Sequence, residues 1–143
     1  LIAAVREAGA RIVLIGDGDV AGVMATAMPE TGVDIYMGTG GAPEGVLAAA
    51  ALRCIGGNIQ GRLLFRNDDE RGRAAKVGVE DLNRKYAITD LASGDVIFAA
   101  TGVTDGNMLQ GVRRTAKYLS TESVAMRART GTVRWIRMQH PIK

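Results

Sequence analysis

The sequence predicts an α/β fold in which helices flank a mixed, mostly parallel sheet. Three observations support this prediction. Continuous apolar runs, such as residues 11–15 and 96–100, are typical of strands that are covered on both faces. Loops rich in glycine and acidic residues follow these runs. Segments with a helical pattern of apolar residues follow the loops after residues 11–15 and 35–37. This is the order of strand–loop–helix units in a parallel sheet.

The first third of the chain predicts a helix, a strand and a second helix. Residues 1–8 form a helical pattern that Gly9 ends, and residues 11–15 are the first predicted strand. After a loop at 16–19, a helix should carry Val20, Val23, Met24 and Ala27 on one face and end at Pro29. Because the sequence does not start with Met, we expect it to begin inside a longer protein.

Residues 34–52 predict a strand, a glycine-rich loop and a helix in succession. Residues 35–37 are apolar and favour a buried strand, and three nearby glycines then allow the backbone to pass close to another group. Pro43 suits the start of a helix, and residues 46–52 are apolar on every face, as in a buried helix. The exposed N–H groups of such a helix N-terminus favour anions. Glu44 in the first turn therefore suggests a divalent metal, Mn²⁺ or Mg²⁺, that bridges its carboxylate and a phosphate.

Each acidic residue in these loops also has a structural interpretation. Glu44 could simply complement the helix dipole, and Asp19 is well placed to cap its helix. Asp17 lies between two glycines and is the better candidate for contact with a ligand. A dinucleotide loop is a weak alternative because Pro43 stands where the third glycine belongs. A P-loop is also a weak alternative because the Lys-Ser/Thr pair is missing.

The second half predicts further strands. Residues 62–65, 96–100, 120–129 and 132–138 favour strands, the last two paired around Gly131. Residues 66–73 favour an exposed turn, 79–82 a short helix, and 86–88 are ambiguous. The loop at 101–106 borders the ligand or is a plain turn. Cys54, which shares an apolar stripe with Leu47, is expected to be a buried structural thiol, and His140 a surface or packing residue.

Charge and hydropathy limit the possible partners. Residues 113–143 contain eight Lys or Arg and one acid, within a chain of net charge +3. With few aromatic residues among them, these cations favour either a solvated basic face or one that steers anionic metabolites, so we expect no nucleic-acid partner. No apolar run is long enough for a membrane span, and no signal peptide is visible, so we expect no membrane partner and a cytoplasmic protein.

The chain resembles the C-terminal part of the class II, GlpX-type fructose-1,6-bisphosphatases. The resemblance covers essentially all 143 residues and rests on residues 17–21, 36–52, 98–106 and 124–134. It implies the fold of the C-terminal domain of sugar phosphatases of the inositol-monophosphatase and fructose-bisphosphatase type. Residues 1–143 would form a single domain of a longer chain whose N-terminal, metal-binding half is absent.

The resemblance also implies roles for individual residues. Asp17, Gly18, Asp19 and Gly41 would contact the sugar phosphate, and Glu44 would bind the catalytic Mn²⁺ or Mg²⁺. The reaction would remove the 1-phosphate of fructose 1,6-bisphosphate to give fructose 6-phosphate in gluconeogenesis. Some relatives also accept sedoheptulose 1,7-bisphosphate.

Other parts of the site should lie outside this sequence. The remaining metal ligands and the phosphate-binding arginines would lie in the missing half, so we assign no catalytic residue here. We expect the chain alone to be inactive, and a homo-oligomer in the complete protein. The alternative is a non-catalytic α/β module that binds phosphosugars or nucleotides.

Overall fold

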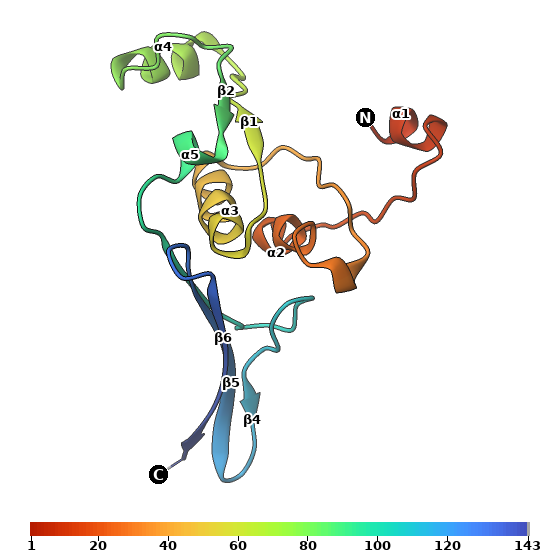
Figure 1. The fold of residues 1–143 in the computed structure, drawn as a ribbon, viewed down its shortest axis with the longest axis vertical. Helices are drawn as coiled ribbons and strands as arrows, with labels where there is room; N and C mark the ends of the chain where they lie inside the picture. Colours follow the sequence, from red (N-terminus) through yellow and green to blue (C-terminus); the bar gives the residue numbers. More distant parts are fainter. Residues whose placement is uncertain (143) are drawn as a thin grey trace.

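The computed structural model describes residues 1–142 and contains two antiparallel sheets joined by helices (Figure 1). The elements in chain order are α1 (Ile2–Glu7), α2 (Asp19–Ala25), η1 (Pro29–Thr31), α3 (Ala42–Ile55), β1 (Gln60–Arg62), α4 (Asp68–Lys76), β2 (Lys85–Ala87), α5 (Ile88–Leu91), β3 (Ile97–Thr101), β4 (Arg113–Arg114), β5 (Tyr118–Arg127) and β6 (Thr132–Pro141). Strands β1 and β2 form the small sheet, and β3 to β6 form the larger one.

The prediction of a mostly parallel sheet is wrong. Strand β5 pairs antiparallel with β3, β4 and β6, and β1 pairs antiparallel with β2. The apolar runs at 11–15 and 35–37, which should have been parallel strands, form no strand in the described chain. Val13 is 80% exposed and Ile35 is 65% exposed. A parallel strand requires a neighbouring strand and cover on both faces, and these two runs find neither within residues 1–142.

The long hairpin at the C-terminal end confirms the prediction of paired strands. Strands β5 and β6 pair from Arg127↔Thr132 to Tyr118↔Pro141. Gly131 in the turn has a φ of 60°, which a residue with a side chain rarely adopts. Strand β3 is also confirmed, one residue later than expected, and pairs with the half of β5 nearest the turn.

The core lies between α3, α2 and one face of the larger sheet. Met24 of α2, Ala51 and Cys54 of α3, and Val124 and Met126 of β5 pack together. Cys54 is 3% exposed, which confirms the prediction of a buried thiol. The sheet can approach α3 closely because the buried positions of this helix are mostly alanines.

The prediction that α3 is buried on every face is wrong. Val46 is 43% exposed and Leu47 is 51% exposed. The larger sheet, α2 and α5 each pack against part of α3. The remaining side has no cover among residues 1–142, so composition alone overstated the burial of this helix.

Helix α4 replaces the predicted exposed turn. The Asn67 side chain accepts a hydrogen bond of 2.9 Å from the Glu70 N–H and caps the helix. Three acids in the first turn and two bases in the last then complement the helix dipole. Two further predictions fail nearby: β1 precedes the expected strand at 62–65 and overlaps it only at Arg62, and residues 79–82 are not helical.

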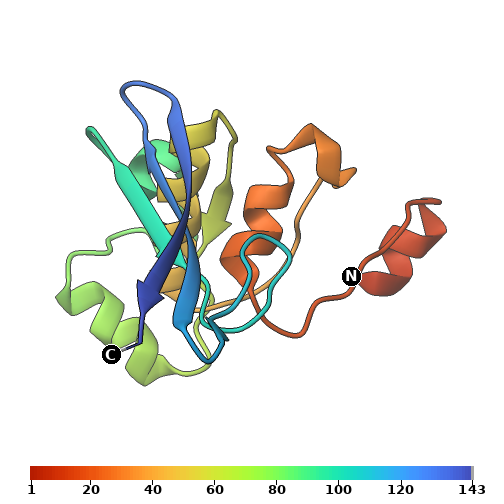
Figure 2. The same cartoon turned by 90° about the horizontal axis from the view of Figure 1, so that it is seen from below.

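Helix α1 stands apart from the other elements in both views of the ribbon (Figures 1 and 2). Its presence and its end near Gly9, which has a φ of 78°, confirm the sequence prediction. None of its residues is buried. The helix therefore rests on local backbone hydrogen bonds and not on packing.

Candidate functional site

Three loops that lie far apart in the sequence meet around one hollow of about 660 Å³. The first loop leads into α2, the second begins α3, and the third follows β3. The lining residues are Gly16, Asp17, Gly18, Asp19, Val20, Ala21, Glu44, Leu47, Phe98, Ala99, Ala100, Thr101, Gly102, Thr104, Gly106, Asn107, Met108 and Leu109. Asp17, Gly18, Asp19 and Glu44 are thus brought together around the hollow, whereas Gly41 is not among its lining residues. The strands expected to position the first two loops do not form within residues 1–142.

The first loop turns sharply at Gly18. This residue has a φ of 75° and is the N-cap of α2, so Asp19 is the first residue of the helix. No side chain caps α2, and the interpretation of Asp19 as an N-cap is therefore wrong. The Asp19 carboxylate instead lies against the second loop, where a Cβ on Gly40 would be only 2.9 Å from its Oδ2 atom.

Tyr36 connects the second loop to α2. Its ring packs over Gly22, where an added Cβ would lie 3.1 Å from the ring. Burial raises the pKa of the Tyr36 phenol, and the neighbouring Asp19 carboxylate raises it further. The phenol is therefore protonated at neutral pH and lies beside the Asp19 carboxylate. The sequence predicts Tyr36 only as a strand residue, because no local pattern indicates that its ring reaches α2.

Gly41 and Glu44 form the entrance of α3. Gly41 is the N-cap of the helix, and its carbonyl accepts a hydrogen bond of 3.1 Å from the Gly45 N–H. The Glu44 side chain folds back over Gly41 so closely that a Cβ there would overlap its carboxylate. A side chain at residue 41 would therefore displace the Glu44 carboxylate from this position. Glu44 lies in the first turn of α3, where its charge is favourable against the helix dipole.

The third loop, residues 102–112, joins β3 to β4 and is fixed at its base by β5. The Gly102 N–H donates to the Glu122 carbonyl at 2.9 Å, and the Gln110 N–H donates to the Glu122 carboxylate at 3.0 Å. Arg137 of β6 pairs with the same carboxylate. The Gln110 N–H and Arg137 together lower the pKa of Glu122, which stays ionised as an anchor.

A second anchor closes the β3–β4 loop from within. The Asp105 carboxylate accepts hydrogen bonds from the Gly111 N–H at 2.9 Å and from the Arg113 guanidinium at 2.9 Å and 3.0 Å. Leu109 is 7% exposed and anchors the loop in the core. The sequence pattern at 101–106 left a ligand border and a plain turn equally open, and the structure places this loop along the hollow.

The acidic side chains do not form a complete metal centre. Asp17, Asp19 and Glu44 provide hard oxygen donors, which suit Mg²⁺ or Mn²⁺. Nevertheless, no three His, Cys, Asp or Glu side chains within residues 1–142 lie close enough to hold an ion. The donors of this chain are therefore of the right kind but too few.

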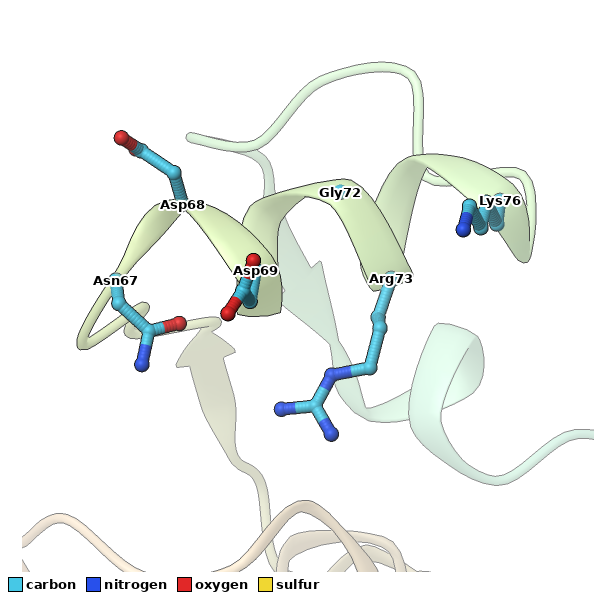
Figure 3. A pocket seen from close by; sticks show the side chains of 6 residues that line it. All are labelled: Asn67, Asp68, Asp69, Gly72, Arg73 and Lys76. Atoms are coloured by element: carbon cyan, nitrogen blue, oxygen red, sulfur yellow. The ribbon is translucent and has the colours of Figure 1, made fainter.

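A second hollow lies along α4 and is lined by Asn67, Asp68, Asp69, Gly72, Arg73 and Lys76 (Figure 3). All six residues belong to one exposed helix and its cap. Asp68 points away from Arg73 in this view. Because a single exposed helix provides all the residues of this hollow, we attribute no function to it.

Several cations of the C-terminal basic segment are paired with acids. Arg127 binds Asp95 and lowers the pKa of that carboxyl group, and Arg129 also pairs with it. Arg113 and Arg137 hold Asp105 and Glu122, as described above. His140 is exposed on β6, in agreement with the surface interpretation. Lys143, the last cation of the segment, lies outside the described residues.

Comparisons with known proteins are consistent with the resemblance in the sequence. A family model described as bacterial fructose-1,6-bisphosphatase, glpX-encoded, matches residues 1–140. The chain is 39% identical to the D-fructose 1,6-bisphosphatase class 2/sedoheptulose 1,7-bisphosphatase of Synechococcus sp. (strain JA-3-3Ab), over 98% of this chain and 44% of the relative. It is 38% identical to the fructose-1,6-bisphosphatase class 2 of Haemophilus influenzae, over 98% of this chain and 46% of the relative. The chain therefore spans less than half the length of these relatives.

The described part of the chain contains no helix that is both long and apolar enough to cross a membrane.

Proposed function

The chain belongs to the family of bacterial, glpX-encoded fructose-1,6-bisphosphatases, and on this premise we propose that it is the C-terminal domain of a sugar bisphosphatase. The complete enzyme would hydrolyse the 1-phosphate of fructose 1,6-bisphosphate, giving fructose 6-phosphate and inorganic phosphate. We place this reaction in gluconeogenesis and in the cytoplasm. Sedoheptulose 1,7-bisphosphate is a second candidate substrate, because the name of one relative includes it.

The convergence of three loops on one hollow carries this proposal. Asp17 lines it from the loop before α2, Asp19 from the start of α2 and Glu44 from α3, and the β3–β4 loop closes another side. Carboxylates and backbone groups around a concave surface suit a hydroxylated ligand, since each carboxylate accepts hydrogen bonds from hydroxyl groups. We assign sugar-phosphate contacts to Asp17, Gly18, Asp19 and the backbone of Gly41.

We propose that Glu44 is one ligand of a divalent cation, Mn²⁺ or Mg²⁺. When bound, such an ion stabilises negative charge on a phosphoryl group. The further ligands would come from residues outside this chain, because the described residues provide too few donors. For the same reason, we expect the 143 residues alone to release no phosphate.

The metal role of Glu44 can be tested in the full-length protein with Glu44→Gln, which keeps the size of the side chain and removes its charge. Binding of Mn²⁺ should weaken at least tenfold in calorimetry, since even changing a residue behind a metal ligand costs about 10- to 100-fold. Phosphate release from fructose 1,6-bisphosphate should fall in parallel. Glu30→Gln, in the exposed helix η1, is the matched control. Unchanged Mn²⁺ affinity in Glu44→Gln would leave Glu44 as a helix-dipole residue only.

The dependence on a second half can be tested by reconstitution. The 143-residue chain is mixed with a separately expressed upstream half, and phosphate release is measured with Mn²⁺ present. We expect activity only in the mixture. Full turnover by the 143-residue chain alone would contradict this part of the proposal. Size-exclusion chromatography with light scattering on the full-length protein tests whether the enzyme is a homo-oligomer.

The second candidate function is a non-catalytic module that binds phosphosugars or nucleotides. The incomplete set of metal donors is the observation that favours it. Such a module would bind fructose 1,6-bisphosphate equally well with and without Mn²⁺. Calorimetry under both conditions therefore separates the two functions.

A further inference from the structure

The polar side chains of the β3–β4 loop fall into two groups. Asp105 is committed to Arg113 and the Gly111 N–H, and Thr101, just before the loop, shares a hydrogen bond of 2.8 Å with Ser123. Thr104 and Asn107 are different. Both line the hollow, and neither side chain forms a hydrogen bond with another residue in the described chain. These two groups are available to a ligand.

The backbone that carries Thr104 and Asn107 is held in place. A Cβ on Gly111 would lie 2.6 Å from the Thr104 carbonyl carbon, so the two sides of the loop are in direct contact. The Val112 N–H donates to the Val103 carbonyl at 3.1 Å, and the Gly106 N–H donates to the Leu109 carbonyl at 3.0 Å. Because this backbone is already fixed, only the side-chain rotamers of Thr104 and Asn107 have to be ordered when a ligand binds, which favours selective binding.

The charge of the hollow defines the part of the ligand that fits. Its lining contains the carboxylates of Asp17, Asp19 and Glu44, and no Lys, Arg or His among the described residues. A phosphate dianion therefore fits only beside the cation proposed at Glu44, because these carboxylates would repel it elsewhere in the hollow. Sugar hydroxyls fit instead, because carboxylates accept their hydrogen bonds, and Thr and Asn side chains both donate and accept.

We propose that Thr104 and Asn107 are specificity-determining residues that bind uncharged hydroxyl groups of the sugar bisphosphate. The phosphate groups of the substrate then lie away from the side of the hollow that the β3–β4 loop forms. This inference rests on the proposed function and extends it, because it assigns the β3–β4 loop to the polyol part of the substrate.

The test uses the full-length protein with Asn107→Ala and Thr104→Val. Gln110→Ala is the matched control, because Gln110 belongs to the same loop but does not line the hollow. Two probes are compared: fructose 1,6-bisphosphate, and hexane-1,6-diol bisphosphate, which has two phosphates and no hydroxyl. The KM for the sugar bisphosphate should rise about three- to tenfold in each variant, the effect of one lost hydrogen bond. The kcat should stay within about twofold, because such contacts are equally strong in the bound substrate and the transition state.

The second probe separates hydroxyl binding from other roles. Inhibition by hexane-1,6-diol bisphosphate should be unchanged in both variants, because this probe has no hydroxyl group that Thr104 or Asn107 could bind. Equal weakening of both probes would overturn the inference, because the residues would then bind phosphate or support the fold. Unchanged KM in both variants would also overturn it. If Asn107→Ala lowers the thermal stability, Asn107→Ser replaces it in the same comparison. Failure of the unaltered protein to hydrolyse or bind fructose 1,6-bisphosphate is a separate result, which refutes the proposed function itself.

Discussion

Gly102→Ala should strongly destabilise the chain because the two sides of the β3–β4 loop leave no room for a side chain. A Cβ at Gly102 would overlap the Gln110 carbonyl oxygen and lie 2.9 Å from its carbonyl carbon and 3.1 Å from the Leu109 Cβ. Overpacking of this kind costs about 1–3 kcal/mol. We expect the upper end, about 3 kcal/mol, because the obstacle is backbone and cannot rotate away.

The assay is urea unfolding of the 143-residue chain, followed by far-UV circular dichroism. In thermal unfolding, 3 kcal/mol corresponds to a Tm lower by about 10 °C, since the unfolding entropy of a chain of this size is about 0.3 kcal/mol per degree. Gly106→Ala is the matched control in the same loop. A Cβ there would approach no closer than 3.8 Å, to the Leu109 carbonyl oxygen, so its effect should stay within about 0.5 kcal/mol.

Equal stability of Gly102→Ala and Gly106→Ala would refute the reasoning. It would mean that the loop backbone yields to a methyl group and is not a fixed wall. The inference about Thr104 and Asn107 would then lose its structural support, because their positions depend on the same backbone.

Three further predictions concern other parts of the molecule. Leu52→Ala should cost about 2–5 kcal/mol in urea unfolding, since Leu52 is 0% exposed, whereas Leu47→Ala, at 51% exposed on the same helix, should cost less than about 1 kcal/mol. Arg127 lowers the pKa of Asp95 in the folded chain, so this carboxylate contributes stability above its unfolded pKa of about 4 and loses that contribution as the pH falls through its lower folded pKa. The urea midpoint of Asp95→Asn should therefore fall less steeply below pH 4 than that of the unaltered chain. The same dependence of the midpoint on pH in both proteins would contradict this. Val13→Lys should leave the stability of the 143-residue chain within about 0.5 kcal/mol, because Val13 is 80% exposed. The same change should destabilise the full-length protein if its other half covers this residue, and differential scanning calorimetry of both forms would show the difference.

Elements with strong local signals could be predicted from the sequence. The entrance and end of α3 follow from Pro43 and from Gly56, whose φ is 81°. The β5–β6 hairpin follows from two strand-forming segments on either side of Gly131. In each case, the residues that determine the structure are neighbours in the chain, and their conformational preferences are sufficient.

Elements that depend on distant partners could not be predicted. The apolar runs at 11–15 and 35–37 have the composition of buried strands, but composition does not say which segment will pair with them. Helix α4 was missed for a different reason: it lacks an apolar stripe, and only Asn67 with the acids that follow it indicates a capped helix start.

The candidate site shows the same division. The acidic and glycine-rich loops were visible in the sequence, and the structure brings them to one hollow. The contact between Tyr36 and Asp19, and the anchoring of Gln110 by Glu122, join residues that no local pattern relates. The position of the β3–β4 loop was therefore left open by the sequence.

The contribution of three distant segments to a single hollow has a consequence for folding. Asp17, Glu44 and Asn107 meet only after α2, α3 and β3 have docked, so no short peptide from this chain can reproduce the arrangement. The chain would therefore bind a small molecule that contacts all three residues only at the last stage of refolding. Such a molecule would serve as a probe of the completely assembled state, whereas circular dichroism would register the helices earlier.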